Sequence, residues 1–204
     1  MTNRRRPDGE LVLVAGASRC GKTLWTRRQV APARRLLVFD TKREWGAYPG
    51  IIACDTRRAA LELLRDGGPR LRVAYAPGPA LRDDFDWWAD CSLQWGISAP
   101  CVVVAEELAS VTSAGKAPRA WGHLVRTGLG EGITIYALTQ SPSESDKTTV
   151  RNASRLHVGR LGYRPDIDYL ADLLWVERAE LAALSPLQFI ERDANGVILR
   201  GRLT

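Results

Sequence analysis

The sequence predicts an α/β fold with a mainly parallel β-sheet, helices on both faces of the sheet and a C-terminal β-hairpin. Short apolar runs alternate along the chain with segments that predict helices, which is typical of βαβ units. One of these runs leads through a glycine-bounded loop into a helix. Near the C-terminus, Asn195-Gly196 separates two further apolar runs, and this dipeptide is a strong hairpin signal.

Each element follows from local signals. The apolar runs predict strands at residues 11–15, 36–39, 51–54, 71–75, 101–105, 133–138, 156–159, 187–190 and 197–199. Helices are expected at residues 22–30, 56–65, 81–95, 119–129, 165–176 and 177–184. Thr56 is a suitable N-cap for the second helix, and proline and glycine clusters separate the elements. Residues 143–152 are polar and predict a loop or a short helix.

Length and composition fit one globular domain. The 204 residues are 45% hydrophobic, which is enough for one sizeable core. We expect residues 1–9 to form a flexible basic N-terminus and residues 10–204 to form a single domain. No apolar run approaches the roughly 18 residues that span a bilayer. No apolar segment follows the basic N-terminal residues, so we expect neither a transmembrane segment nor a signal peptide.

The chain is basic, with 29 Lys and Arg residues against 23 Asp and Glu residues and a net charge of +6. This balance favours a polyanionic partner such as nucleic acid, although an arginine-rich solvated surface has the same composition. The four cysteines show no C-x-x-C spacing. We therefore expect no zinc site and no disulfide framework, and a reducing compartment.

An eight-residue stretch has the spacing G-x-x-x-x-G-K-[ST] of a phosphate-binding loop: Gly16, Ala17, Ser18, Arg19, Cys20, Gly21, Lys22 and Thr23. A predicted strand precedes the stretch and a predicted helix follows it. Gly16 and Gly21 allow backbone N–H groups to point at phosphate oxygens. Lys22 would reach the β- and γ-phosphates, and the Thr23 hydroxyl would contact Mg²⁺. The sequence therefore predicts that the chain binds ATP with Mg²⁺.

Polar side chains follow two other predicted strands. The β-branched run at residues 101–105 predicts a central strand of a parallel sheet, and Glu106 and Glu107 lie at its C-terminal end, where such sheets bind ligands. We expect Glu106 to support Mg²⁺ and Glu107 to activate water. Gln140 ends the strand at residues 133–138 and would hydrogen-bond the γ-phosphate or the attacking water. Two surface glutamates at a strand end are the alternative.

The motifs together resemble one superfamily. They are the phosphate loop, the strand-end segment Asp40-Thr41-Lys42-Arg43-Glu44, the Glu106-Glu107 pair and Thr139-Gln140-Ser141-Pro142. This combination resembles the FtsK/HerA superfamily of P-loop motor ATPases. The compact size and the Glu-Glu-Leu-Ala ending of the carboxylate strand resemble the genome-packaging ATPases of membrane-containing, double-jelly-roll double-stranded DNA viruses and phages. The resemblance covers roughly residues 10–160.

The resemblance implies a RecA-like core of the ASCE class of P-loop NTPases and a homo-oligomeric ring, a hexamer, that pumps double-stranded DNA into a procapsid. An arginine of the neighbouring subunit would complete the active site, and Arg126 is the best match, with Arg119 and Arg151 as weaker candidates. The loop at residues 109–116 is the candidate for gripping DNA. Contacts with capsid or portal-vertex proteins, and a location in the host cytoplasm or the virion, are also implied.

Two other functions stay open at this point. A nucleotide or small-molecule kinase also uses a phosphate loop and a chain of about 200 residues. Against this hypothesis, the adjacent Glu106 and Glu107 and the strand-end Gln140 favour water as the nucleophile. The second alternative is a DNA-pumping or morphogenesis ATPase of the same superfamily that does not package a genome.

Overall fold

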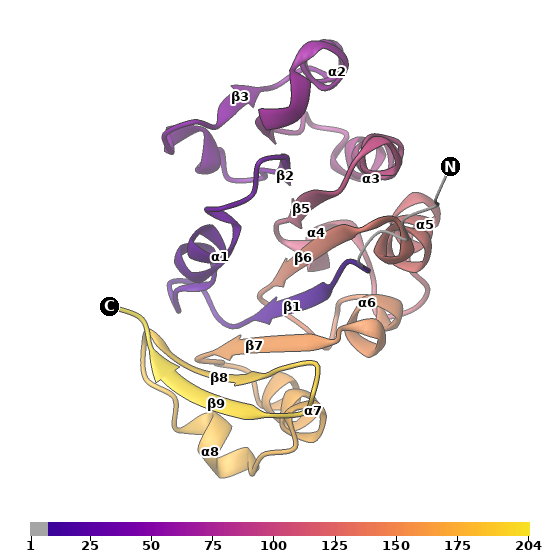
Figure 1. Ribbon diagram of the computed structural model, residues 1–204. Helices are drawn as coiled ribbons and strands as arrows, with labels where there is room; N and C mark the ends of the chain where they lie inside the picture. The colour runs from indigo at the N-terminus through magenta and orange to yellow at the C-terminus, as the bar shows by residue number, and fades with distance from the viewer. Residues whose placement is uncertain (1–7) are drawn as a thin grey trace, which may run out of the picture. The chain divides into compact units, whose positions relative to one another are not determined.

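The computed structural model describes residues 8–204 (Figure 1). Within this range the chain forms two compact units that are discontinuous in sequence. Unit 1 comprises the described residues up to Glu10 together with Pro32–Glu106 and Pro118–Ile135, and unit 2 comprises Leu11–Ala31, Glu107–Ala117 and Tyr136–Thr204. Most of the predicted flexible N-terminus, residues 1–7, lies outside the described residues. The single domain expected for residues 10–204 stays a prediction.

Unit 1 is built on a parallel sheet. Its strands follow the order β3 (Ile52–Cys54), β4 (Arg72–Tyr75), β2 (Leu36–Phe39), β5 (Cys101–Ala105) and the first three residues of β6 (Ile133–Thr139). Strand β2 pairs in parallel with β4 on one side and with β5 on the other. All four side chains of β2 are buried, as expected for a strand in a sheet that is covered on both faces.

The helices of unit 1 match the predicted ones closely. They are α2 (Arg57–Asp66), α3 (Leu81–Ser98) and α5 (Arg119–Thr127), with short 3₁₀ turns at Trp45–Ala47, Gly68–Arg70 and Gly128–Glu131. The Thr56 hydroxyl accepts the Ala59 N–H at 3.2 Å, which confirms the predicted N-cap. Helices α3 and α5 pack through aromatic rings, because Trp121 lies 5.2 Å from Phe85 and 6.4 Å from Trp88 between ring centroids.

Unit 2 contains the remaining strands. Their order is the last four residues of β6, then β1 (Leu11–Ala15), β7 (Arg155–Gly159), β8 (Gln188–Arg192) and β9 (Ile198–Arg202). Strand β1 pairs in parallel with β7, whereas β8 is antiparallel to both β7 and β9. Since β6 is common to both units, residues 8–204 contain nine strands, mainly parallel. The predicted fold class is confirmed.

Five helices belong to unit 2: α1 (Lys22–Val30), α4 (Leu108–Val111), α6 (Lys147–Asn152), α7 (Arg164–Leu174) and α8 (Arg178–Ala182). Helix α6 is the short helix that the polar segment 143–152 allowed. Its N-cap is Asp146, whose carboxylate accepts the Thr149 N–H at 2.8 Å. Among residues 8–204, no helix combines the length and the hydrophobicity needed to cross a membrane.

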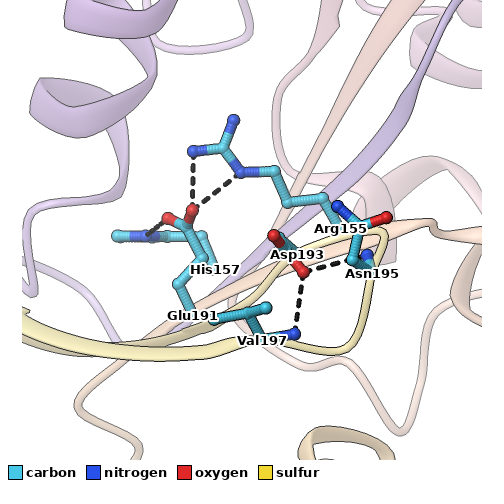
Figure 2. Close-up of polar contacts among 6 residues, drawn as sticks. All are labelled: Arg155, His157, Glu191, Asp193, Asn195 and Val197. Atoms are coloured by element: carbon cyan, nitrogen blue, oxygen red, sulfur yellow. Dashed lines mark hydrogen bonds and ion pairs between the residues drawn. The ribbon is translucent and has the colours of Figure 1, made fainter.

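The predicted C-terminal hairpin is present, and its turn is fixed by one carboxylate (Figure 2). Asp193 Oδ1 accepts the N–H groups of Asn195 and Val197 at 2.9 and 2.8 Å. Gly196 has φ +82°, in the left-handed region that glycine tolerates and most other residues avoid. The Asn-Gly signal therefore identified the turn because the turn requires this backbone conformation.

Candidate functional site

The backbone of the phosphate loop requires its two glycines. Gly16 and Gly21 have φ values of +148° and +104°. A Cβ atom added at Gly16 would lie 2.6 Å from Cys20 Sγ, and one added at Gly21 would lie 2.6 Å from Leu203 Cδ1. Both backbone conformations therefore favour glycine, and a side chain at either position would also have to displace a neighbouring one. Helix α1 begins immediately after Gly21, so its positive dipole end faces the loop, as in a phosphate site.

Strands on either side of β1 hold the loop in place. The Gly16 N–H donates to the Thr139 carbonyl at the end of β6, at 3.2 Å. The Ala17 N–H donates to the Arg160 carbonyl just after β7, at 2.8 Å. The start of the loop is therefore fixed to the same sheet edge as Thr139, the residue directly before the predicted γ-phosphate contact.

Lys22 and Thr23 occupy the first turn of α1. The Lys22 side chain is only 8% exposed, and its Nζ donates to the carbonyls of Gly16 at 2.7 Å and Ala17 at 3.1 Å. The ammonium charge is thus held against the loop backbone, on the residues that would surround a phosphate. The Thr23 hydroxyl is an oxygen donor of the kind that Mg²⁺ prefers.

Glu106 directly follows β5 in an almost fully buried position of unit 1, with 2% exposure. Its N–H donates to the Phe39 carbonyl at 3.3 Å, and its Oε1 accepts the indole N–H of Trp45 at 2.9 Å. Burial raises the pKa of Glu106 to about 7, while the Trp45 hydrogen bond acts in the opposite direction and the Asp40 charge adds to the rise. A nearby cation would favour the ionised form of this carboxylate.

Glu107 has a different environment although it is the next residue. Its φ of +52° and ψ of +50° lie in the left-handed region, which costs a residue with a Cβ atom about 1–2 kcal/mol. Strained backbone of this kind concentrates at functional sites. Glu107 Oε1 accepts the amide N–H of Gln140 at 2.7 Å. The structure therefore brings together two residues that were predicted from the ends of different strands.

The segment after Gln140 is tied to the segment after Glu107. Thr139 Oγ1 and Ser145 Oγ lie 2.8 Å apart, and the next residue, Asp146, donates its N–H to Thr112 Oγ1 at 3.3 Å. Thr112 follows α4, the helix that begins directly after Glu107. The glutamine loop, the Glu107 turn and the start of the loop after α4 thus form one hydrogen-bonded frame in unit 2.

The predicted site residues divide between the units. Residues 16–23, Glu107 and Gln140 belong to unit 2, whereas Glu106 and Arg126 belong to unit 1. Arg126 is exposed on α5. It lines a surface cleft of about 370 Å³ together with Asp86, Asp90, Arg119, Ala120 and His123. The weaker candidate Arg119 therefore shares the cleft, and the role of Arg126 toward a neighbouring subunit stays a prediction.

Comparison with known proteins identifies the family. No protein-family model matches the sequence. Over 176 residues the chain is 33% identical to protein P9 of Pseudoalteromonas phage PM2, and the match covers 84% of this chain and 78% of that protein. The chain belongs to the family of phage protein P9.

Solved structures similar to this P9-family protein share its fold. The genome packaging NTPase B204 from Sulfolobus turreted icosahedral virus 2, in complex with ATP-γS, has a TM-score of 0.77 at 14% identity, over 96% of this chain and 98% of that one. The cytoplasmic domain of the type VII secretion ATPase EccC from Thermomonospora curvata has a TM-score of 0.58 at 13% identity, over 97% of this chain and 24% of that one. The P-loop NTPase fold predicted from the sequence is confirmed, since this chain shares it with a genome packaging NTPase and a secretion ATPase.

The two predicted Mg²⁺ ligands of the P9-family protein lie in different units, Thr23 in unit 2 and Glu106 in unit 1. Thr23 and Glu106 offer a hydroxyl and a carboxylate oxygen, the ligand types that Mg²⁺ binds alongside substrate phosphates. Within residues 8–204, no group of three or more His, Cys, Asp or Glu side chains forms a metal centre of its own.

Sequence reasoning missed Trp45 and the burial of Asp40. The segment at residues 40–44 drew attention as one of the motifs that carry the resemblance. The structure shows Asp40 with 2% exposure, accepting the backbone N–H groups of Glu44 and Trp45 at 3.0 and 2.9 Å. Its carboxylate therefore shapes the turn that carries Trp45 to Glu106. The only signal in the sequence is the position of Asp40, four residues before Glu44 and five before Trp45, whose backbone N–H groups it accepts.

Proposed function

We propose that this P9-family protein hydrolyses ATP to pump double-stranded DNA and acts as a viral genome-packaging motor. The observation that carries the proposal is the hydrogen bond between Gln140 and Glu107 in the unit that also holds the phosphate loop. A carboxylate and an amide at neighbouring strand ends suit the activation of water, whereas a kinase must exclude water. The likeness to packaging NTPase structures supports the DNA-pumping part.

In the proposed mechanism the loop N–H groups and Lys22 bind the phosphates. Thr23 and Glu106 would hold Mg²⁺, which supplies positive charge to the phosphate oxygens when bound. Glu107 accepts a proton from the attacking water as the water oxygen bonds to the γ-phosphorus and the bond to the β-phosphate oxygen breaks. Gln140 holds Glu107 and contacts the γ-phosphate or the water.

The proposed assembly is a homo-oligomeric ring, a hexamer, around double-stranded DNA. The exposed position of Arg126 supports a role in the active site of a neighbouring subunit. The net charge of +6 supports a polyanionic partner. As a packaging motor the protein would meet capsid or portal-vertex proteins, in the host cytoplasm or in the virion.

The test compares ATP hydrolysis by wild type, Glu107→Gln and the control Glu144→Gln, each with and without long duplex DNA at low salt. Glu144 is exposed in the loop after Gln140, so Glu144→Gln makes the same chemical change at a residue with no assigned role. We expect Glu107→Gln to lower kcat by about 10²- to 10⁴-fold, Glu144→Gln to leave it unchanged, and DNA to raise the wild-type rate.

Each part of the proposal has its own contradicting result. Unchanged hydrolysis by Glu107→Gln would remove the assigned base. A rate that ignores DNA in the oligomeric protein would remove the pump and leave an ATPase with another partner. Transfer of phosphate to a nucleoside monophosphate, in place of its release into water, would identify a kinase.

A further inference from the structure

Both residues of the Trp45–Glu106 contact are held in place by the structure around them. Trp45 is fully buried, and its indole N–H donates to Glu106 Oε1 at 2.9 Å. An indole N–H can only donate, and an ionised carboxylate can only accept, so this contact satisfies both groups. The Glu106 N–H is held by the Phe39 carbonyl, the last residue of β2. The chain leaves β2 at this point and reaches Trp45 six residues later.

The turn between Phe39 and Trp45 is built to place the indole. Both carboxylate oxygens of the buried Asp40 accept backbone N–H groups, one from Glu44 and one from Trp45 itself. Gly46 follows, where an added Cβ would lie 2.6 Å from the Ala53 Cβ, so the turn packs directly against β3. The indole has little freedom to move, and it therefore restricts the orientation of the carboxylate that it contacts.

A second tryptophan of the same unit shows that this hydrogen bond is not a general property of buried indoles here. Trp88 is 1% exposed and packs against Phe39, Phe85 and Trp121. Among residues 8–204, its Nε1 has no hydrogen-bond partner. Trp88 thus serves packing alone, while Trp45 combines packing with a donor directed at a predicted site carboxylate.

We propose that Trp45 is a positioning residue that fixes the orientation of the Glu106 carboxylate, the proposed Mg²⁺ support, with Asp40 fixing the turn that carries the indole. The proposal rests on the proposed ATP and Mg²⁺ site and adds a residue to it. It assigns the strand-end segment at residues 40–45 to the support of a carboxylate and not to direct contact with the nucleotide. Loss of a hydrogen bond to a metal-ligating side chain changes metal affinity by about 10- to 100-fold.

The test measures binding of a fluorescent ATP analogue to the full chain, once with Mg²⁺ and once with EDTA. The quantity of interest is the ratio of the two dissociation constants, which isolates the contribution of the metal. Trp45→Phe removes the N–H donor and keeps an aromatic ring, and Trp88→Phe makes the same substitution without touching a carboxylate. We expect Trp45→Phe to reduce the ratio by about 10-fold or more and Trp88→Phe to leave it at the wild-type value.

Asp40→Asn provides a second variant that retains the indole. It removes one charged acceptor from the turn, and we expect a smaller reduction, a few-fold, of the same ratio. If Trp45→Phe does not fold, as judged by circular dichroism, Asp40→Asn decides alone. Wild-type ratios for the folded variants, or an equal loss in Trp88→Phe, would overturn the proposal. A wild-type protein that binds no nucleotide would instead overturn the proposed function.

Discussion

Replacing Glu191 with glutamine should destabilise unit 2, because this carboxylate is the centre of a buried polar cluster beside the phosphate-loop helix (Figure 2). Oε1 of Glu191, on β8, accepts the Nε–H of Arg155 on β7 at 2.8 Å and forms an ion pair with its Nη2 at 2.6 Å, and Oε2 lies 3.0 Å from His157 Nδ1. The His157 ring stacks on Trp25 of α1 at 3.9 Å between centroids. The cluster thus connects the hairpin to α1.

The size of the effect follows from burial. Removing one partner of a buried ion pair costs about 3–5 kcal/mol, and an exposed pair contributes about 0–1 kcal/mol. The Arg155 side chain is 23% exposed and the Glu191 side chain 8%. Water can therefore partly solvate the guanidinium left behind, and we expect a loss of about 2–3 kcal/mol. For a chain of this size that corresponds to a decrease in Tm of roughly 4–12 °C.

The pH dependence of stability tests whether the charge of Glu191 causes the effect. Burial opposes ionisation of Glu191, but its bonds to His157 and Arg155 outweigh it and lower its pKa from 4.5. The carboxylate therefore stabilises the fold above pH 4.5, and this contribution is lost as pH falls through the folded-state pKa. Burial lowers the pKa of His157 from 6.5 in the folded protein. As pH falls, this imidazole is therefore protonated first in the unfolded chain, which also reduces the stability of the fold. The difference between wild type and Glu191→Gln should shrink below pH 4.5.

The assay is unfolding by heat and by urea at pH 7.5 and pH 4, followed by circular dichroism. The control is Glu180→Gln, which removes the partner of Arg200 on β9, an exposed pair in the same unit. We expect that control to change Tm very little. An equal loss in both variants, or a Glu191→Gln difference that persists unchanged at pH 4, would refute the burial reasoning.

Two further predictions concern the proposed motor function. Thr112→Val removes the acceptor of the Asp146 N–H and loosens the hydrogen-bonded frame around Glu107 and Gln140. We expect normal nucleotide binding and a DNA-stimulated ATPase rate that is reduced several-fold. Unchanged stimulation by DNA would contradict this role of Thr112. Arg126→Ala and Glu107→Gln should each inactivate the protein, whereas mixed rings of the two should regain part of the ATPase rate because some sites combine an intact Glu107 with an intact Arg126. A mixture as inactive as its components would contradict action between subunits.

The sequence was sufficient for elements with local signals. The glycine spacing at Gly16 and Gly21 reflects backbone conformations that only glycine adopts easily, and Asn195-Gly196 does the same for the hairpin. The Thr56 N-cap acts within three residues. In these cases the physical cause lies inside the segment where the residues occur, so composition and spacing express it directly.

Contacts between distant segments could not be predicted in this way. Trp45 and Glu106 are 61 positions apart, and Glu191 and His157 are 34 apart. Each residue alone is compatible with ordinary packing or with a solvated surface. The left-handed conformation of Glu107 also has no sequence signal, since glutamate is not a residue that favours it. The packing of the whole fold selects these features, and the sequence of one segment does not.

The different environments of the two adjacent glutamates give a physical reason for assigning them different roles. Glu106 is buried with an indole donor, and its pKa of about 7 means that the folded protein supplies less stabilisation of its charge than water does. A bound cation would provide the missing stabilisation, which suits a metal-supporting carboxylate. Glu107 leaves the strand through a left-handed turn and meets Gln140 in a partly exposed position, where water has access. Access to water is the condition for a general base in hydrolysis, so the backbone reversal at Glu107 would separate the two proposed roles within one pair of residues.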